Sequence, residues 1–176
     1  MQKKSVILGV RLNHQSKIKI WKELQKIIQI ENYSQKIVVT PNPEILVHAF
    51  QNKKLKRYLN EADFSLADGF GLSIFAKLSG QKLERIVGAD LVKDILKKAN
   101  ENQNKVLVLN WNGGLSTIKE IEEGLLKIYP NIKLKVLEMD RKNLENIEIF
   151  AKINAFSPDI FLNTLGNPYQ EEYLLR

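Results

Sequence analysis

Short apolar runs alternate with amphipathic helical segments along the 176-residue sequence, and this alternation limits the possible folds more than any other feature. Each run has the length of a buried strand, and each following segment has the apolar spacing of a helix face. The predicted strands are Ser5–Val10, Lys36–Thr40, Phe64–Ala67, Val106–Leu109, Ile132–Met139 and Ile160–Leu165. The predicted helices are Ser16–Glu31, Pro43–Phe50, Lys53–Ala62, Leu72–Leu78, Leu91–Asn100, a segment ending near Tyr129, and Asn143–Phe156. This order predicts a single α/β domain over residues 1–176, with a mostly parallel sheet covered by helices on both faces.

Composition narrows the classes of partner and cofactor. Lysine and arginine number 27 against 20 aspartate and glutamate, and the net charge of +7 favours anionic partners such as nucleotides, lipid head groups or nucleic acid. The absence of cysteine excludes disulfides and thiolate metal sites, and two histidines make a zinc site improbable. No apolar run approaches the ~20 residues of a membrane-spanning helix, and the first run is too short for a signal peptide.

Two segments of the first half have more than one interpretation. The basic cluster Lys53–Arg57 is usually a solvated face, and the alternative is contact with an anionic membrane surface or a phosphate. The helix Pro43–Phe50 is apolar on most sides and is predicted to be buried, with His48 as a hydrogen-bonded core residue. Its apolar surface could also serve an interface, and a homo-oligomer is predicted.

Two strand-to-helix turns carry the polar residues from which a site could be built. In the first, Thr40 ends a strand, Asn42 suits a helix N-cap and Pro43 suits the first helical position. In the second, Asp68 ends a strand, and Gly69 and Gly71 let the backbone turn or approach a ligand closely. Ligands of open α/β sheets bind at the carboxyl ends of the strands, and new helix N-termini there favour an anion such as a diphosphate. Ordinary turn chemistry explains either turn alone, but the pair favours a site.

Two later segments could converge on the same crevice. Arg85 lies in an irregular segment, where a phosphate contact and a rim salt bridge are about equally good explanations. Asp90 is explained as the N-cap of the helix Leu91–Asn100 without any catalytic role. The turn Gly166–Gln170 repeats the pattern of a strand, a Gly/Pro turn and a new helix.

Several common catalytic motifs are missing from the sequence. It contains no P-loop, no Gly-x-Gly-x-x-Gly fingerprint, no Gly-x-Ser-x-Gly elbow and no Asp-x-Asp pair. A single well-placed carboxylate with small polar groups and an arginine fits displacement of a phosphate leaving group without a metal. In such a reaction one base deprotonates a hydroxyl nucleophile, while helix N-termini and the arginine bear the charge of the diphosphate.

These residues resemble the WecG/TagA/CpsF family of bacterial glycosyltransferases, and the resemblance covers nearly the whole chain. The matching pieces, in order, are Ile7-Leu8-Gly9-Val10, Thr40-Pro41-Asn42-Pro43-Glu44, Asp68-Gly69-Phe70-Gly71, Arg85-x-x-Gly88-x-Asp90-Leu91 and Leu165-Gly166-x-Pro168-x-Gln170-Glu171. Each piece is short, but the ordered set is specific.

The resemblance implies a Rossmann-like, inverting enzyme that uses neither a metal nor another cofactor. Such enzymes transfer N-acetylmannosamine or a related sugar from a UDP donor to N-acetylglucosamine-diphosphate-polyprenyl lipid, in wall teichoic acid or surface polysaccharide synthesis. They work in the cytoplasm, as peripheral proteins at the inner face of the plasma membrane. Asp68 would be the general base, Thr40 and Asn42 would line the acceptor pocket, and Arg85 and Gln170 would hold the donor. Gly69, Gly71 and Gly166 would bring the backbone close to substrate.

The sequence departs from the family pattern in two places that could touch the nucleotide. Asn110–Gly114 replaces a glycine-rich turn, and Met139–Lys142 replaces a Gly-Tyr-Phe-like segment, so the identity of the donor stays open. The resemblance also implies a C-terminal, membrane-seating segment, which is expected to be absent or truncated in this chain. A non-catalytic module that binds nucleotide or lipid phosphate is the alternative function. Nucleic-acid binding ranks last, because the basic residues are dispersed and no aromatic-basic platform is present.

Overall fold

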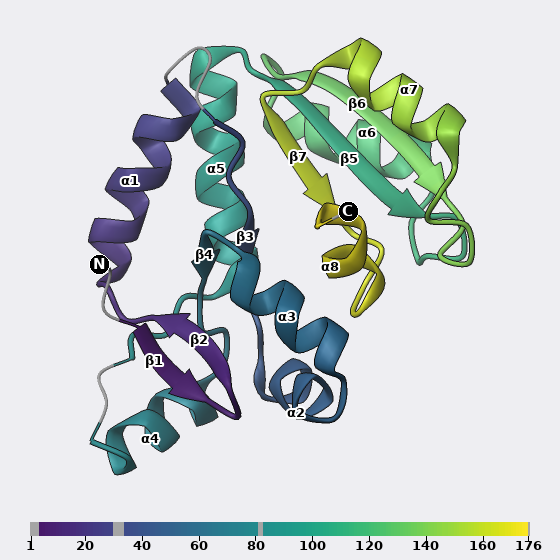
Figure 1. The fold of residues 1–176 in the computed structure, drawn as a ribbon. Helices are drawn as coiled ribbons and strands as arrows, with labels where there is room; N and C mark the ends of the chain where they lie inside the picture. Colours follow the sequence, from purple (N-terminus) through teal and green to yellow (C-terminus); the bar gives the residue numbers. More distant parts are fainter. Residues whose placement is uncertain (1–3, 30–33, 81–82, 176) are drawn as a thin grey trace. The chain divides into compact units, whose positions relative to one another are not determined.

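The computed structural model describes residues 4–29, 34–80 and 83–175, which form two compact units (Figure 1). The first unit comprises Met1–Lys93 with Leu174–Arg176, and the second comprises Asp94–Tyr173. Helix α5 (Gly88–Asn102) begins in the first unit and ends in the second. The predicted helix over 16–31 is observed as α1 (Lys17–Gln29), and its last two predicted residues lie outside the described part of the chain.

The N-terminal segment of the first unit is a β-hairpin rather than one strand. Strand β1 (Lys4–Ile7) pairs antiparallel with β2 (Val10–Asn13). The two residues between them, Leu8 and Gly9, both have positive φ angles, 51° and 82°, as a tight hairpin turn requires. The prediction of a single strand over 5–10 was wrong, because leucine rarely takes this conformation and the sequence gives no sign of the turn.

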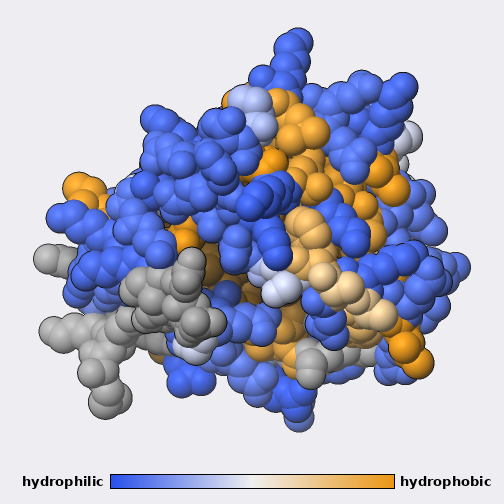
Figure 2. All heavy atoms as spheres, turned by 90° about the horizontal axis from the view of Figure 1, so that it is seen from above, coloured by the Kyte–Doolittle hydropathy of each residue, from blue (hydrophilic) through white to orange (hydrophobic). Residues whose placement is uncertain are grey.

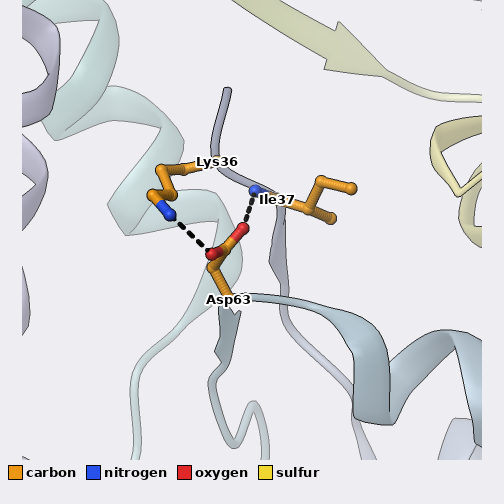
Figure 3. Close-up of polar contacts among 3 residues, drawn as sticks. All are labelled: Lys36, Ile37 and Asp63. Atoms are coloured by element: carbon orange, nitrogen blue, oxygen red, sulfur yellow. Dashed lines mark hydrogen bonds and ion pairs between the residues drawn. The ribbon is translucent and has the colours of Figure 1, made fainter. Parts of the chain in front are cut away.

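A short parallel pair forms the centre of the first unit. Strand β3 (Val38–Val39) pairs with β4 (Phe64–Ser65). Asp63, which precedes β4, accepts hydrogen bonds from the backbone N–H of Ile37 and from the ammonium of Lys36, both at 2.9 Å (Figure 3). Burial alone would raise the pKa of the Asp63 carboxyl, but these two donors outweigh it and hold the pKa below its ordinary value. Asp63 therefore aligns the start of both strands.

Three helices pack on this pair and on the hairpin: α2 (Pro43–Gln51), α3 (Lys53–Glu61) and α4 (Phe70–Leu78). Their shared core consists of Ile7, Val10, Leu12, Val39, Leu46, Ala49, Leu55, Leu59, Ala62, Ala67, Leu72 and Ala76. The prediction that α2 is buried holds only for the face that carries Leu46 and Ala49. Val47 and Phe50 are 52% and 59% exposed, and His48 is also exposed, so the predicted core role of His48 was wrong.

The second unit is built on a three-stranded parallel sheet. Strand β5 (Lys105–Trp111) lies between β6 (Lys133–Met139) and β7 (Ile160–Asn163). Helix α6 (Ile118–Ile128) joins β5 to β6 and lies behind the sheet in Figure 1, and α7 (Ile147–Phe156) joins β6 to β7. Helix α8 (Tyr169–Leu174) follows β7. The core of this unit contains Leu107, Leu109, Leu137, Met139, Leu144, Ile149, Leu165 and Tyr173.

The α/β fold class is confirmed, because strands alternate with helices along the chain. The pairs β3–β4, β5–β6 and β5–β7 are all parallel, as in a Rossmann-like fold. Only the N-terminal hairpin is antiparallel among the described ladders. Figure 2 shows one face of the surface, where hydrophilic side chains predominate and apolar side chains gather in smaller areas. A sequence with 27% charged residues accounts for this distribution.

Candidate functional site

The parallel pairing of β3 with β4 continues past the ends of both strands. The N–H of Leu66 donates to the carbonyl of Val39 at 2.8 Å, and the N–H of Asp68 donates to the carbonyl of Pro41 at 3.0 Å. These bonds hold the two predicted turns side by side at the carboxyl ends of the strands. Asp68 therefore lies beside the Thr40-Pro41 segment, as the two sequence patterns predicted.

Gly88, the first residue of α5, brings the carboxylate and the hydroxyl of this site together. Its N–H donates to Oδ2 of Asp68 at 3.0 Å. A Cβ atom at position 88 would lie 2.7 Å from Oγ1 of Thr40 and 3.3 Å from Oδ2 of Asp68. Among the described residues, Oδ1 of Asp68 has no hydrogen-bond or ion-pair partner. The half-buried Asp68 thus keeps one carboxylate oxygen available for a ligand.

This contact corrects the predicted start of α5. The helix begins at Gly88, so Asp90 lies within its first turn and is not the N-cap. Asp90 is exposed and pairs with Lys93 at 3.8 Å, one turn along the same helix. Asp68 accepts from the helix N-terminus instead, although it lies 20 residues earlier in the sequence.

The starts of α2 and α4 lie against each other beside Asp68. Oδ1 of Asn42 accepts from the N–H of Ile45 at 2.9 Å, which confirms Asn42 as the N-cap of α2 with Pro43 in the first turn. Gly69, the N-cap of α4, has a φ of 147°, and a Cβ there would lie 2.8 Å from Cδ of Pro43. A Cβ at Gly71 would be 4.0 Å from Pro43, so crowding does not require glycine at that position. Three helix N-termini therefore lie close to Asp68, and helix N-termini favour a bound anion through their dipoles.

Arg85 lies in a segment that runs beside the end of β4. The next residue, Ile86, donates its N–H to the carbonyl of Ala67 at 2.9 Å, which places this segment beside the end of β4. Arg85 itself is exposed, and the described part of the chain gives it no ion-pair partner. A salt bridge within those residues therefore does not explain Arg85, and contact with an anionic ligand stays a prediction.

The last two predicted residues, Gly166 and Gln170, lie in the second unit. Gly166 has a φ of 81° and accepts from the N–H of Gln170 at 3.0 Å, so the two residues form one turn before α8. The side chain of Gln170 donates to Glu171 at 2.9 Å. The structure thus groups Thr40, Asp68 and Gly69 around one point of the first unit, and Gly166 and Gln170 around a turn of the second.

Sequence reasoning missed Gly88 as a residue that shapes the site. The motif Arg85-x-x-Gly88 contains it, but nothing in that motif indicates a contact with Thr40. Over residues 4–29, 34–80 and 83–175, no three histidine, aspartate or glutamate side chains cluster as a metal site would need. In the same residues, no helix has the length and apolar character needed to cross a membrane.

Comparison with known proteins identifies a family whose members are similar to this chain. Residues 6–176 match the model of the glycosyl transferase WecG/TagA/CpsF family. A Bacillus spizizenii N-acetylglucosaminyldiphosphoundecaprenol N-acetyl-beta-D-mannosaminyltransferase is 34% identical over 138 residues, which are 78% of this chain and 52% of the relative. A Staphylococcus aureus protein of the same name is 27% identical over 170 residues, which are 96% of this chain and 66% of the relative. The chain spans about half to two thirds of the length of these relatives.

Proposed function

The chain belongs to the WecG/TagA/CpsF family of glycosyl transferases, and we propose that it transfers N-acetylmannosamine, or a related sugar, to N-acetylglucosamine-diphosphate-polyprenyl lipid. The names of its relatives, which describe an N-acetylmannosaminyltransferase that acts on a lipid-linked N-acetylglucosamine, support this acceptor and this sugar. We further propose a UDP donor, inversion at the anomeric carbon and a reaction without a metal. The product would enter wall teichoic acid or surface polysaccharide synthesis.

The observation that carries the proposal is the arrangement of Thr40 and Asp68 around Gly88. In the proposed reaction, Oδ1 of Asp68 takes the proton of the acceptor hydroxyl, and the hydroxyl oxygen attacks the anomeric carbon of the donor sugar. The bond between that carbon and the β-phosphate oxygen breaks, and UDP leaves with the bonding electron pair. A single displacement of this kind inverts the anomeric configuration.

The remaining residues of the first unit would bind the two substrates. Thr40 and the amide nitrogen of Asn42 lie at the end of β3, where an acceptor hydroxyl next to Asp68 would reach them. The N-termini of α2, α4 and α5 and the exposed Arg85 would stabilise the negative charge that develops on the diphosphate. Gly69 permits the close approach of α2 and α4 on which this arrangement depends.

A direct assay tests this function. The 176-residue chain is expected to transfer radiolabel from UDP-N-acetylmannosamine to a short-chain lipid-diphosphate-N-acetylglucosamine, and the product should have the opposite anomeric configuration to the donor. Addition of EDTA should leave the rate unchanged if no metal takes part. Product with retained configuration, or a rate abolished by EDTA, would contradict these parts of the proposal.

The alternative is a non-catalytic module that binds nucleotide or lipid phosphate. It is favoured by the altered segments 110–114 and 139–142. Calorimetry that detects UDP binding, together with no turnover for any UDP-sugar tested, would support the module over the enzyme.

A peripheral position at the cytoplasmic face of the membrane is proposed for the same protein. Helix α3 exposes Lys53, Lys54 and Arg57, and Lys56 lies with its Nζ 5.4 Å from the ring centroid of the exposed Phe50. Cations beside an exposed aromatic ring suit an anionic lipid surface. The chain should cosediment with phosphatidylglycerol vesicles at low salt and not with phosphatidylcholine vesicles, and equal binding to both would contradict this proposal. The homo-oligomer stays a prediction.

A further inference from the structure

A second group of residues, which includes the predicted Gly166, meets at the carboxyl end of the three-stranded sheet. Trp111 is the last residue of β5, Arg141 follows the end of β6 by two residues, and Gly166 follows the end of β7 by three. The three strands are parallel, and their arrowheads point the same way in Figure 1. This edge is where ligands bind in open α/β sheets.

The guanidinium of Arg141 is held in place by its surroundings. Its Cζ lies 3.5 Å from the centroid of the Trp111 ring and 5.6 Å from that of Tyr169. Its Nη2 lies only 2.8 Å from the position that a Cβ would occupy at residue 166, so any side chain there would displace it. The face of the indole ring and the space left by Gly166 therefore hold the guanidinium in this position.

No anion within the described residues neutralises this cation. Arg141 has no hydrogen bond or ion pair there, and its Nε is fully enclosed without a partner. The nearby carboxylates have other partners: Oδ1 of Asp140 accepts from the N–H of Lys142, and the buried Glu171 accepts from the amides of Asn167 and Gln170. A partly buried cation without a counter-ion is costly, and an anionic ligand paired with the guanidinium would lower that cost.

We propose that Arg141 binds the diphosphate of a nucleoside diphosphate, with Trp111 and Gly166 holding its guanidinium ready for that ligand. A planar guanidinium whose two Nη groups have no hydrogen-bond partner among the described residues suits the paired oxygens of a diphosphate. The neighbouring rings of Trp111 and Tyr169 suit the nucleoside part of the ligand. This inference rests on the proposed function for the identity of the ligand, and it assigns a donor contact to the segment 139–142.

Titration of the full chain with UDP tests the proposal. Calorimetry should show UDP affinity lower by about 10- to 100-fold in Arg141→Gln, because charge-assisted hydrogen bonds to the diphosphate are lost. The UDP affinity of Arg141→Lys should lie between those of the wild type and Arg141→Gln, since lysine keeps the charge but not the planar guanidinium. Gly166→Ala should also weaken binding, because its Cβ would occupy the space of Nη2. Lys127→Gln, which removes one positive charge from the exposed last turn of α6, is the control and should bind UDP as the wild type does.

Fluorescence gives a second readout that a purely structural role of Arg141 would not move. The chain has two tryptophans, so a Trp21→Phe protein reports on Trp111 alone. UDP should change that emission, and the change should disappear in Trp21→Phe/Arg141→Gln while circular dichroism shows the fold retained. Arg141→Gln binding UDP within twofold of the wild type, or no UDP binding by the wild type, would overturn the inference. Neither readout requires sugar transfer, so a failure of the proposed reaction and a failure of this site are distinguishable.

Discussion

Asp68→Asn is expected to lower the rate of sugar transfer by at least about 100-fold, because an amide cannot accept the proton of the acceptor hydroxyl. Asparagine is the informative replacement at this position. Its side-chain oxygen can still accept from the N–H of Gly88, so the start of α5 should remain intact. The rate should be measured at saturating donor and acceptor, and thermal unfolding should be measured on the same sample.

The matched control for this variant is Asp90→Asn. Asp90 is an exposed carboxylate of the first turn of α5, close in sequence to Gly88, and its partner Lys93 is also on the surface. Its replacement should leave the rate within about twofold of the wild type, since exposed ion pairs of this kind contribute little. A fully active Asp68→Asn protein would remove Asp68 from the role of general base while leaving the fold and the family unaffected.

The start of α2 and the start of α5 show what the sequence can and cannot predict about this site. Asn42 caps α2 through a bond to Ile45, three residues away, and a local pattern of Asn and Pro is enough to predict it. The N–H of Gly88 donates to Asp68, 20 residues away, and the bond from the N–H of Ile86 to the carbonyl of Ala67 holds this segment beside Asp68. Local reasoning therefore assigned the cap to Asp90.

The same distinction between local and long-range contacts explains the other differences between the predicted and the observed structure. The hairpin turn at Leu8 was missed because its conformation is set by the pairing of β1 with β2 and by packing, not by a residue that favours it. The contact between Trp111 and Arg141 joins two strand ends that lie 30 positions apart in the sequence. The sequence showed the segment 139–142 only as a departure from the family pattern. Parallel pairing of β5 with β6 gives it a candidate role.

Gly88→Ala is expected to destabilise the protein by about 1 to 3 kcal/mol, because its Cβ would overpack the space between Thr40 and Asp68. The backbone of Gly88 lies outside the left-handed region, so the added methyl group is the only cause of strain. Either Thr40 or Asp68 must shift, and displacement of a catalytic group by about 1 Å can lower a rate by ~100-fold. Urea unfolding and the transfer assay should therefore both detect the change. Gly124→Ala in α6, where nothing lies within 4 Å, is the control and should be neutral or slightly stabilising.

A double-mutant cycle with Thr40→Ala separates crowding from other effects of Gly88→Ala. Thr40→Ala removes Oγ1, the atom only 2.7 Å from the new Cβ, and leaves Cβ of residue 40 and Oδ2 of Asp68 at 3.2 and 3.3 Å. In that background, the higher helix propensity of alanine should offset the remaining crowding, and Gly88→Ala should change stability by less than about 0.5 kcal/mol. The coupling energy between the two positions should then be at least about 0.5 kcal/mol. If Gly88→Ala costs the same with and without the threonine hydroxyl, the two side chains do not share the space assigned to them beside Asp68.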